Sequence, residues 1–263
     1  MIDLGDCITI PSAWNDVYFL LFSVYCYTLQ TDFISALSCR FLFAVKSVSL
    51  QNNRHRAIRD LFRNFKRWGI NYQMKVGLYF GSFNPIHHGH LIIANFMLQN
   101  SDLDQIWLVV SPQNPFKQSA SLLSAYDRFN LVQLAVENEP KLKASDIEFK
   151  LPQPSYTVNT LTYLQEKYPT NQFAIIMGSD SFENLAKWKN YEFILQHYPI
   201  FVYRRPGHDV INNFKEANIT ILDAPLLQIS ATHIRNNLRQ GKSIRYLVPD
   251  KVVEEIERNH YYR

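Results

Sequence analysis

The sequence predicts an α/β fold, in which a Rossmann-like, doubly wound parallel sheet carries helices on both faces and is followed by a C-terminal helical part. Two observations lead to this prediction. From residue 74 onward, short strand patterns alternate with helical patterns along the chain. The strand patterns are apolar almost throughout, which is typical of parallel strands that are buried on both faces. In such sheets, ligands bind where the carboxyl ends of strands meet helix N-termini.

The alternation begins with an apolar strand pattern at 75–80 and a helical pattern at 90–99. A second strand pattern covers 105–110, and a helix is expected at 125–138, after a polar loop. The segment 145–149 predicts a short strand. Helical spacing of apolar residues and runs of strand-forming residues distinguish the two kinds of element.

The second half of the region continues in the same way. The segments are a helix at 157–168, a strand at 172–178, and the apolar segments 191–198, 199–205 and 219–223. Two helices close the chain: 230–241 has a serine at its start and a glycine at its end, and 249–259 has a proline in its first turn. These are ordinary start and stop signals of helices.

Residues 1–73 differ from the domain predicted at 74–263. They contain two apolar runs of thirteen residues each, shorter than the roughly 18–20 residues of a membrane helix, and then the basic segment Arg54–Arg67. One interpretation is a membrane-surface anchor, which would make the chain a membrane-associated binding module. The other is upstream translation from a wrongly chosen start, because Met74 opens the organised part. We favour the second interpretation and expect no fold for this extension.

Charge and cysteine usage narrow the functional classes. The first 73 residues hold eight Lys/Arg against five Asp/Glu, and the rest of the chain holds nineteen against eighteen. A nearly neutral domain argues against a nucleic-acid groove. All three cysteines lie in the first forty residues, without CxxC spacing, so neither a disulfide framework nor a structural zinc site is expected. A reducing cytoplasm is the expected compartment.

The stretch "GLYFGSFNPIHHGH" concentrates glycine and histidine at the end of the first strand. Gly81 lets the backbone approach a ligand closely. If the next helix begins at His88 or Gly89, His87 and His90 lie three residues apart on one face of its first turn. A helix N-terminus attracts anions, and two imidazoles there can donate hydrogen bonds to phosphate. Zinc ligation and ordinary surface histidines are the alternatives, and zinc lacks a third ligand nearby in the sequence.

A second stretch, "ISATHIR", predicts another anion-binding helix end. Ser230 is a good N-cap, and Thr232 and Arg235 are again three residues apart on the first turn. An arginine can grip phosphate oxygens with two parallel hydrogen bonds. A capped helix with a surface arginine is the alternative. With the first stretch, the pattern predicts two helix ends that hold one polyphosphate.

Together the two stretches resemble the HxGH nucleotidyltransferases, whose GxFxPxHxGH and ISxTxxR motifs they match. The resemblance implies catalytic roles for His87, His90 and Arg235. It also implies an ATP site, for which we expect Gly81, Ser82, Phe83, Gly178, Asp180, Ile229, Ser230 and Thr232, with the Asp180 carboxylate on the ribose. Neither a P-loop nor a GxGxxG motif occurs in the chain.

Within this group, residues 74–263 resemble the bacterial nicotinate-nucleotide adenylyltransferases. The further segments that match are "NPFK", "PSYT", "GSDSFENLAKW" and "YRRPG". The resemblance implies that nicotinate mononucleotide contacts Lys117, Tyr156, Thr157, Trp188 and Arg205. Trp188 would stack on the pyridine ring, and Tyr156 and Thr157 would face its carboxylate. Core packing for the tryptophan, helix capping for Thr157 and a purely structural turn at Arg205 are the alternatives.

The implied reaction transfers the AMP moiety of ATP to nicotinate mononucleotide, giving nicotinate adenine dinucleotide and pyrophosphate in NAD biosynthesis. The attacking phosphate is already an anion, so the protein's work is positioning and charge neutralisation. Mg²⁺ would arrive with ATP, and the chain itself is expected to provide no metal site. Another HxGH adenylyltransferase, with nicotinamide mononucleotide or pantetheine phosphate as the acceptor, is the nearest alternative. The sequence is also compatible with a homo-oligomer.

Overall fold

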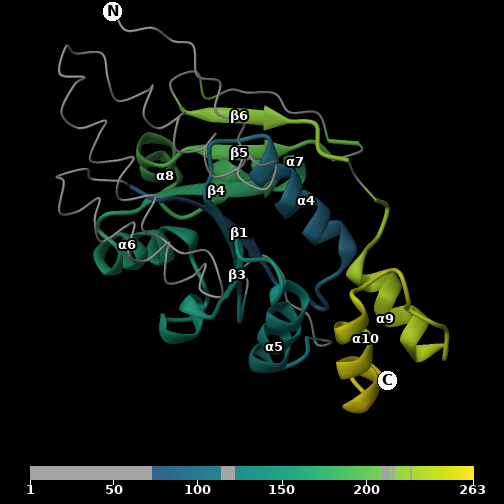
Figure 1. The fold of residues 1–263 in the computed structure, drawn as a ribbon. Coiled ribbons are helices and arrows are strands. Elements are labelled where there is room, and N and C mark those ends of the chain that lie inside the picture. The colour runs from purple at the N-terminus through teal and green to yellow at the C-terminus, as the bar shows by residue number, and fades with distance from the viewer. Residues whose placement is uncertain (1–72, 114–121, 206, 209–213, 215–216, 226) are drawn as a thin grey trace, which may run out of the picture. The chain divides into compact units, whose positions relative to one another are not determined.

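The structure is a computed structural model that describes residues 73–113, 122–205, 207–208, 214, 217–225 and 227–263 (Figure 1). These residues belong to one compact unit, Tyr72–Arg263. The N-terminal extension, except for Gln73, lies outside the described residues, so its two interpretations stay predictions. Among the residues that are described, no helix is long and apolar enough to cross a membrane.

Six parallel strands form a single sheet in the order β3-β2-β1-β4-β5-β6. The strands are β1 (Lys75–Gly81), β2 (Gln105–Val110), β3 (Leu142–Ser145), β4 (Gln172–Gly178), β5 (Ile200–Tyr203) and β6 (Ile219–Leu222). The chain runs outward from β1 to β3 and then returns to place β4 beside β1. The strand order therefore reverses between β1 and β4, where doubly wound sheets bind their ligands. The predicted fold class is confirmed.

Helices cover both faces of the sheet, as Figure 1 shows. The helices are α4 (His88–Gln99), α5 (Ala125–Val136), α6 (Thr157–Lys167), α7 (Ser179–Phe182), α8 (Tyr191–His197), α9 (Ala231–Arg239) and α10 (Asp250–Arg258), with the 3-10 turns η2 (Ile147–Lys150) and η3 (Leu185–Lys187). One buried cluster contains residues of α4, α5, α9 and α10, and the other contains residues of α6, α7 and α8. The two clusters lie on opposite faces of the sheet.

Strand β2 shows why the apolar runs have no polar positions. Ile106, Leu108 and Val110 belong to the cluster on one face, whereas Trp107 and Val109 belong to the cluster on the other. Successive side chains of a strand point to opposite faces, so a strand buried on both faces needs apolar residues at every position.

The short strand predicted at 145–149 is wrong. The structure has β3 at Leu142–Ser145 and the 3-10 turn η2 at Ile147–Lys150. In the register of β3 against β2, Ser145 lies opposite Val109, so only one residue of β2 remains beyond that pair. The chain therefore has no partner strand to follow and turns away from the sheet.

The helix termini largely follow the predicted signals. Helix α9 begins after Ser230, whose hydroxyl accepts a hydrogen bond from the backbone N–H of His233 at 3.1 Å. Gly241 follows this helix with φ +67°, a conformation that glycine adopts without strain. Pro249 lies at the N-cap of α10, one position before the helix.

A buried arginine in α5 joins the loops at the carboxyl end of the sheet. Arg128 is only 1% exposed. Its guanidinium donates to the carbonyls of Ser82 after β1, at 2.5 Å, of Ser111 and Pro112 after β2, at 2.9 and 3.2 Å, and of Leu123 before α5, at 2.9 Å. Ser82 lies in the loop after β1, and the other three carbonyls lie at the two ends of the loop between β2 and α5. This one side chain therefore fixes two loops relative to each other.

Replacing Arg128 with leucine should therefore destabilise the domain strongly. Buried carbonyls would lose their donor, so we expect the free energy of unfolding to fall by at least about 3 kcal/mol and the Tm by roughly 6–12 °C. Thermal unfolding followed by circular dichroism measures this. The matched control is Arg258→Leu, which removes an exposed pair with Glu255 and should change stability by less than about 0.5 kcal/mol. Equal effects of the two changes would contradict the role of Arg128.

Candidate active site

A cleft of about 690 Å³ opens where the strand order reverses. Its walls come from the loop after β1, the loop before α6, the segment after β4, the end of β5 and the first turn of α9. The sequence-predicted site residues that line it are Gly81, Ser82, Phe83, His90, Tyr156, Thr157, Gly178, Asp180, Trp188, Arg205, Thr232 and Arg235. Residues from both predicted anion-binding helix ends thus face one cleft.

Arg235 connects the first turn of α9 directly to the loop before α4. Its guanidinium donates to the backbone carbonyl of Asn84 at 2.7 Å and to the hydroxyl of Thr232 at 3.3 Å. Its Nε is buried and has no hydrogen-bond partner in the described part of the chain. The Asn84 side chain accepts from the backbone N–H of Leu123 at 3.2 Å, which fixes the loop that receives the arginine. A cation is therefore held between the two motifs.

The two histidines stack at the start of α4. Helix α4 begins at His88, so His87 is the N-cap residue, and the rings of His87 and His90 lie 3.7 Å apart with an interplanar angle of 28°. The rings of Phe83 and His90 pack edge to face, with their centres 5.0 Å apart. A Cβ on Gly89 would lie 3.0 Å from Nδ1 of His87, so only glycine leaves full room for the stacked ring. The two imidazoles thus lie side by side at the start of α4, as their spacing in the sequence predicts.

His87 lies behind His90 and is 6% exposed. Burial, followed by the positive charges of Arg205 and His88, lowers the pKa of His87 from 6.5 to about 4. The imidazole is therefore neutral at neutral pH and holds one N–H donor. An anion bound beside it would favour the protonated form again, because an opposite charge offsets the cost of desolvation.

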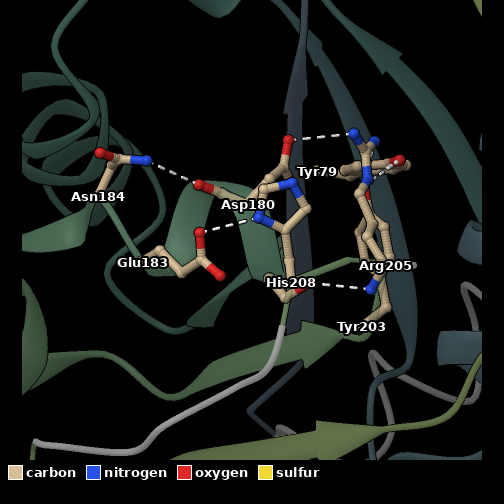
Figure 2. A network of polar contacts seen from close by, with 8 residues as sticks. Tyr79, Asp180, Glu183, Asn184, Tyr203, Arg205 and His208 are labelled. Atoms are coloured by element: carbon tan, nitrogen blue, oxygen red, sulfur yellow. Dashed lines mark hydrogen bonds and ion pairs between the residues drawn. The ribbon is translucent and has the colours of Figure 1, made fainter.

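A chain of polar contacts among residues that line the cleft runs from β1 through the end of β5 to α7 (Figure 2). The hydroxyls of Tyr79 and Tyr203 lie 3.2 Å apart, and the Arg205 guanidinium donates to the Tyr203 hydroxyl at 3.1 Å and to Oδ2 of Asp180 at 3.1 Å. Oδ1 of Asp180 is buried and has no partner among the residues that the structure describes. One carboxylate oxygen is thus fixed by Arg205, and the other is left for a ligand.

Gly178 makes room for this carboxylate. A Cβ there would lie 2.5 Å from Oδ1 of Asp180, 3.0 Å from Nε of Arg205 and 3.1 Å from the Tyr203 ring. The helix α7 begins at Ser179, so Asp180 lies inside its first turn and is not its N-cap.

Aromatic residues also line the cleft, among them Trp188 and Tyr156. Trp188 is half-buried and packs against the core cluster on the α6 face, and Lys189 Nζ lies 4.8 Å from the centre of the Tyr156 ring. Helix α6 begins at Thr157, and no side chain caps it, so the predicted alternative of Thr157 as an N-cap is wrong. Lys117 lies outside the described residues.

Three predicted residues do not line the cleft: His87, Ile229 and Ser230. Ser230 caps α9, and the carbonyl of Ile229 lies 3.9 Å from the position of a Cβ on Gly89. Sequence reasoning missed other lining residues, above all Tyr79, Tyr203 and Glu148. For the tyrosines, the position at the end of a strand is a signal that could have been used.

No group of three or more His, Cys, Asp or Glu side chains in the described ranges could hold a metal ion. The charged side chains on the cleft wall are mainly cationic: Lys187, Lys189, Arg205 and Arg235, against Asp180 and the buried Glu148. Such a surface suits an anionic ligand that carries its own counterion.

Comparisons with known proteins agree with this geometry. A cytidylyltransferase-like family model matches residues 78–237. A protein of Flavobacterium psychrophilum, named "Probable nicotinate-nucleotide adenylyltransferase", is 55% identical over 192 residues, which are 72% of this chain and 100% of the relative. A protein of the same name from Cytophaga hutchinsonii is 56% identical over 191 residues, 72% of this chain and 98% of the relative.

A solved structure shares the fold. The nicotinic acid mononucleotide adenylyltransferase of Plasmodium falciparum, complexed with NaAD, superposes with a TM-score of 0.62. The match covers 72% of this chain and 98% of that one, at 19% identity. At this identity, the likeness concerns the fold alone.

The depressed pKa of His87 predicts a loss of stability in acid. The folded-state pKa of about 4 lies below the unfolded value of 6.5, so the contribution is complete above pH 6.5 and is lost as pH falls toward 4. Urea unfolding at pH 7.5 and 4.5 should show that the wild type loses about 2–3 kcal/mol more than His87→Gln over this range. The exposed His260, changed to glutamine, is the control and should behave as the wild type. Parallel losses in all three proteins would refute the assignment.

Proposed function

The chain belongs to the bacterial nicotinate-nucleotide adenylyltransferase family, and we propose that it transfers the AMP moiety of ATP to nicotinate mononucleotide. The products are nicotinate adenine dinucleotide and pyrophosphate, in NAD biosynthesis. The observation that carries the proposal is the cleft in which Arg235 joins the two helix ends. A reducing cytoplasm, expected from the cysteine usage, is part of the proposal.

The triphosphate of ATP is placed between the two helix ends. His87 and His90 would hold the α- and β-phosphates, and Thr232 and Arg235 the β- and γ-phosphates. The His90 imidazole and the Arg235 guanidinium support this placement, because both line the cleft, and His87 stacks directly on His90. Gly81, Ser82 and Phe83 would let the backbone approach the nucleotide, and Ile229 and Ser230 would shape the start of α9.

The ribose of ATP is assigned to Asp180. Its buried Oδ1 is a free acceptor, and Gly178 leaves the space in which that oxygen lies. Arg205 was predicted to contact nicotinate mononucleotide. Its pair with Asp180 shows a second task for it, which is to hold the carboxylate in place, and contact with the mononucleotide stays part of the proposal.

Nicotinate mononucleotide is placed against the aromatic residues that line the cleft. Trp188 would stack on the pyridine ring, since a half-buried indole offers a flat apolar face. Tyr156 and Thr157 would face the pyridine carboxylate at the N-terminus of α6, where the helix attracts an anion. Lys117 is retained as a candidate for the phosphate of the mononucleotide.

The chemistry requires orientation more than proton transfer. A phosphate oxygen of the mononucleotide attacks the α-phosphorus of ATP in line, the bond to the β-phosphate oxygen breaks, and pyrophosphate leaves. The attacking oxygen is an anion near neutral pH, so no general base is needed. The protein holds both substrates in register and offers donors to the oxygens that gain charge.

Mg²⁺ is proposed to enter with ATP, held mainly by phosphate oxygens and water. The fit rests on the donor set: the described part of the chain has no cluster of three ligating side chains, and the cleft is lined by donors and cations. When bound, the ion would neutralise part of the charge on the phosphates.

The acceptor is tested with a substrate panel. With ATP, we expect nicotinate mononucleotide to exceed nicotinamide mononucleotide and pantetheine phosphate in kcat/KM by about 10²-fold or more, because the pyridine carboxylate meets a helix N-terminus. Pyrophosphate release under steady-state conditions is the measurement. A preference for either of the other acceptors would replace the proposal with that activity.

The imidazole that faces the cleft is tested by His90→Ala. Removing one donor to the transition state should lower kcat by about 10²–10³ and leave the Tm nearly unchanged. His88→Ala is the matched control: His88 belongs to the same turn but does not line the cleft, so kcat should stay near the wild-type value. A kcat close to that of the wild type in His90→Ala would discredit the assignment.

A further inference from the structure

Glu148 is a buried carboxyl beside the cleft that none of the motifs includes. It lies in η2, between β3 and α6, and is 1% exposed. It is also among the residues that line the cleft, next to Ser155, Tyr156 and Thr157. Buried carboxyls without a basic partner are rare in proteins, so the position calls for a physical explanation.

The carboxyl is surrounded by hydroxyl groups. Oε1 accepts a hydrogen bond from the Thr160 hydroxyl of α6 at 2.9 Å. Burial raises the pKa of Glu148, and the hydroxyls of Ser111, Thr160 and Ser155 oppose that rise. Ser111 directly follows β2, Thr160 belongs to α6, and Ser155 lies in the loop between η2 and α6. The carboxyl thus lies where three parts of the cleft wall meet.

The same turn holds the loop before α6. The carbonyl of Glu148 accepts from Nε2 of Gln153 at 3.0 Å, and Oε1 of Gln153 accepts from the Ser155 hydroxyl at 3.1 Å. The backbone N–H of Ser155 donates to the carbonyl of Gln113, after β2, at 3.0 Å. The loop is therefore fixed to η2 on one side and to the segment after β2 on the other.

This loop positions the start of α6 at the wall of the cleft. The Tyr156 carbonyl accepts from the N–H groups of Asn159 and Thr160, at 3.0 and 3.3 Å, and no acidic side chain lies in the first turn. No side chain caps the helix. The position of this helix end is set by Thr160 and by the loop. Thr160 bonds to the Glu148 carboxyl, and Gln153 of the loop bonds to the Glu148 carbonyl.

We propose that Glu148 is a positioning residue of the pyridine subsite: through Thr160 and the loop ending at Ser155, it fixes the helix end that receives the pyridine carboxylate. This inference rests on the proposed function and deepens it. It assigns to a residue outside the motifs part of the recognition of the acceptor. ATP is placed between the starts of α4 and α9, so its binding does not depend on this contact.

The experiment compares Glu148→Ala, Glu148→Gln, Thr160→Val and Thr162→Val in the full chain. Wild-type turnover of nicotinate mononucleotide is measured first, because its absence would refute the proposed function before any variant is considered. Thr162 is the matched control: it is a threonine of the same helix, but its hydroxyl donates to the carbonyl of Val158 at 3.0 Å. KM for each substrate, kcat and Tm are measured for every protein.

Glu148→Ala and Thr160→Val should each raise KM for nicotinate mononucleotide about tenfold, with kcat and KM for ATP changed less than about twofold. Glu148→Gln keeps an acceptor for Thr160 and should stay within about threefold of the wild type. Combining Glu148→Ala with Thr160→Val should add little to the worse single change, since both remove the same contact.

Two results would overturn the inference. One is an equal rise of KM for both substrates, which would mark Glu148 as a general structural residue. The other is an unchanged KM for nicotinate mononucleotide in Thr160→Val, with wild-type behaviour in Thr162→Val. If Glu148→Ala fails to fold, Thr160→Val decides, because it removes a single hydroxyl and keeps the shape of the side chain.

Discussion

The guanidinium of Arg128 is the constraint on which the cleft depends. A parallel sheet places the ends of its strands at one edge, but it does not determine how the loops beyond those ends lie. Here one buried cation donates hydrogen bonds to carbonyls of two loops, the loop between β2 and α5 and the loop that follows β1 and leads to the stacked histidines. Hydrogen bonds from a charged donor are stronger than neutral ones, and five N–H groups in one plane suit several carbonyls at once. The chain obtains a rigid site from loops without a disulfide or a metal ion in the part of it that the structure describes.

Charge is distributed in the cleft according to the ligand it is proposed to hold. His87 is kept neutral by burial and by the charge of Arg205, so it adds no further positive charge behind a cleft wall that is already mainly cationic. Arg205 in turn is paired with Asp180, and Arg235 points to a backbone carbonyl. Each cation thus has a partner that holds it in place before a nucleotide binds. Preorganised donors of this kind need little rearrangement when charge develops on a phosphate.

The sequence predicted the fold and the two helix ends because both depend on local patterns. Continuous apolar runs identify buried parallel strands, and the spacing of His87 and His90, or of Thr232 and Arg235, fixes which side chains share a helix face. What could not be predicted depends on tertiary contacts. Arg128 follows an aspartate on an amphipathic helix and resembles a surface residue. Glu148 stands between two apolar residues, a pattern that predicts a strand. The roles of both follow only from which loops end beside them.

The contact between Asn84 and Arg235 also constrains when the cleft can form. The two residues are 151 positions apart, and α4 is tied in the same way to the segment after α9, since the His88 N–H donates to the carbonyl of Leu247 at 3.0 Å. During synthesis, the strands from β1 to β6 leave the ribosome before these partners exist. A nascent chain that has assembled its whole sheet still lacks the residues of α9 that line the cleft. Contacts of such sequence separation form late and slowly, so competence to bind nucleotide arises only with the final fifth of the polypeptide.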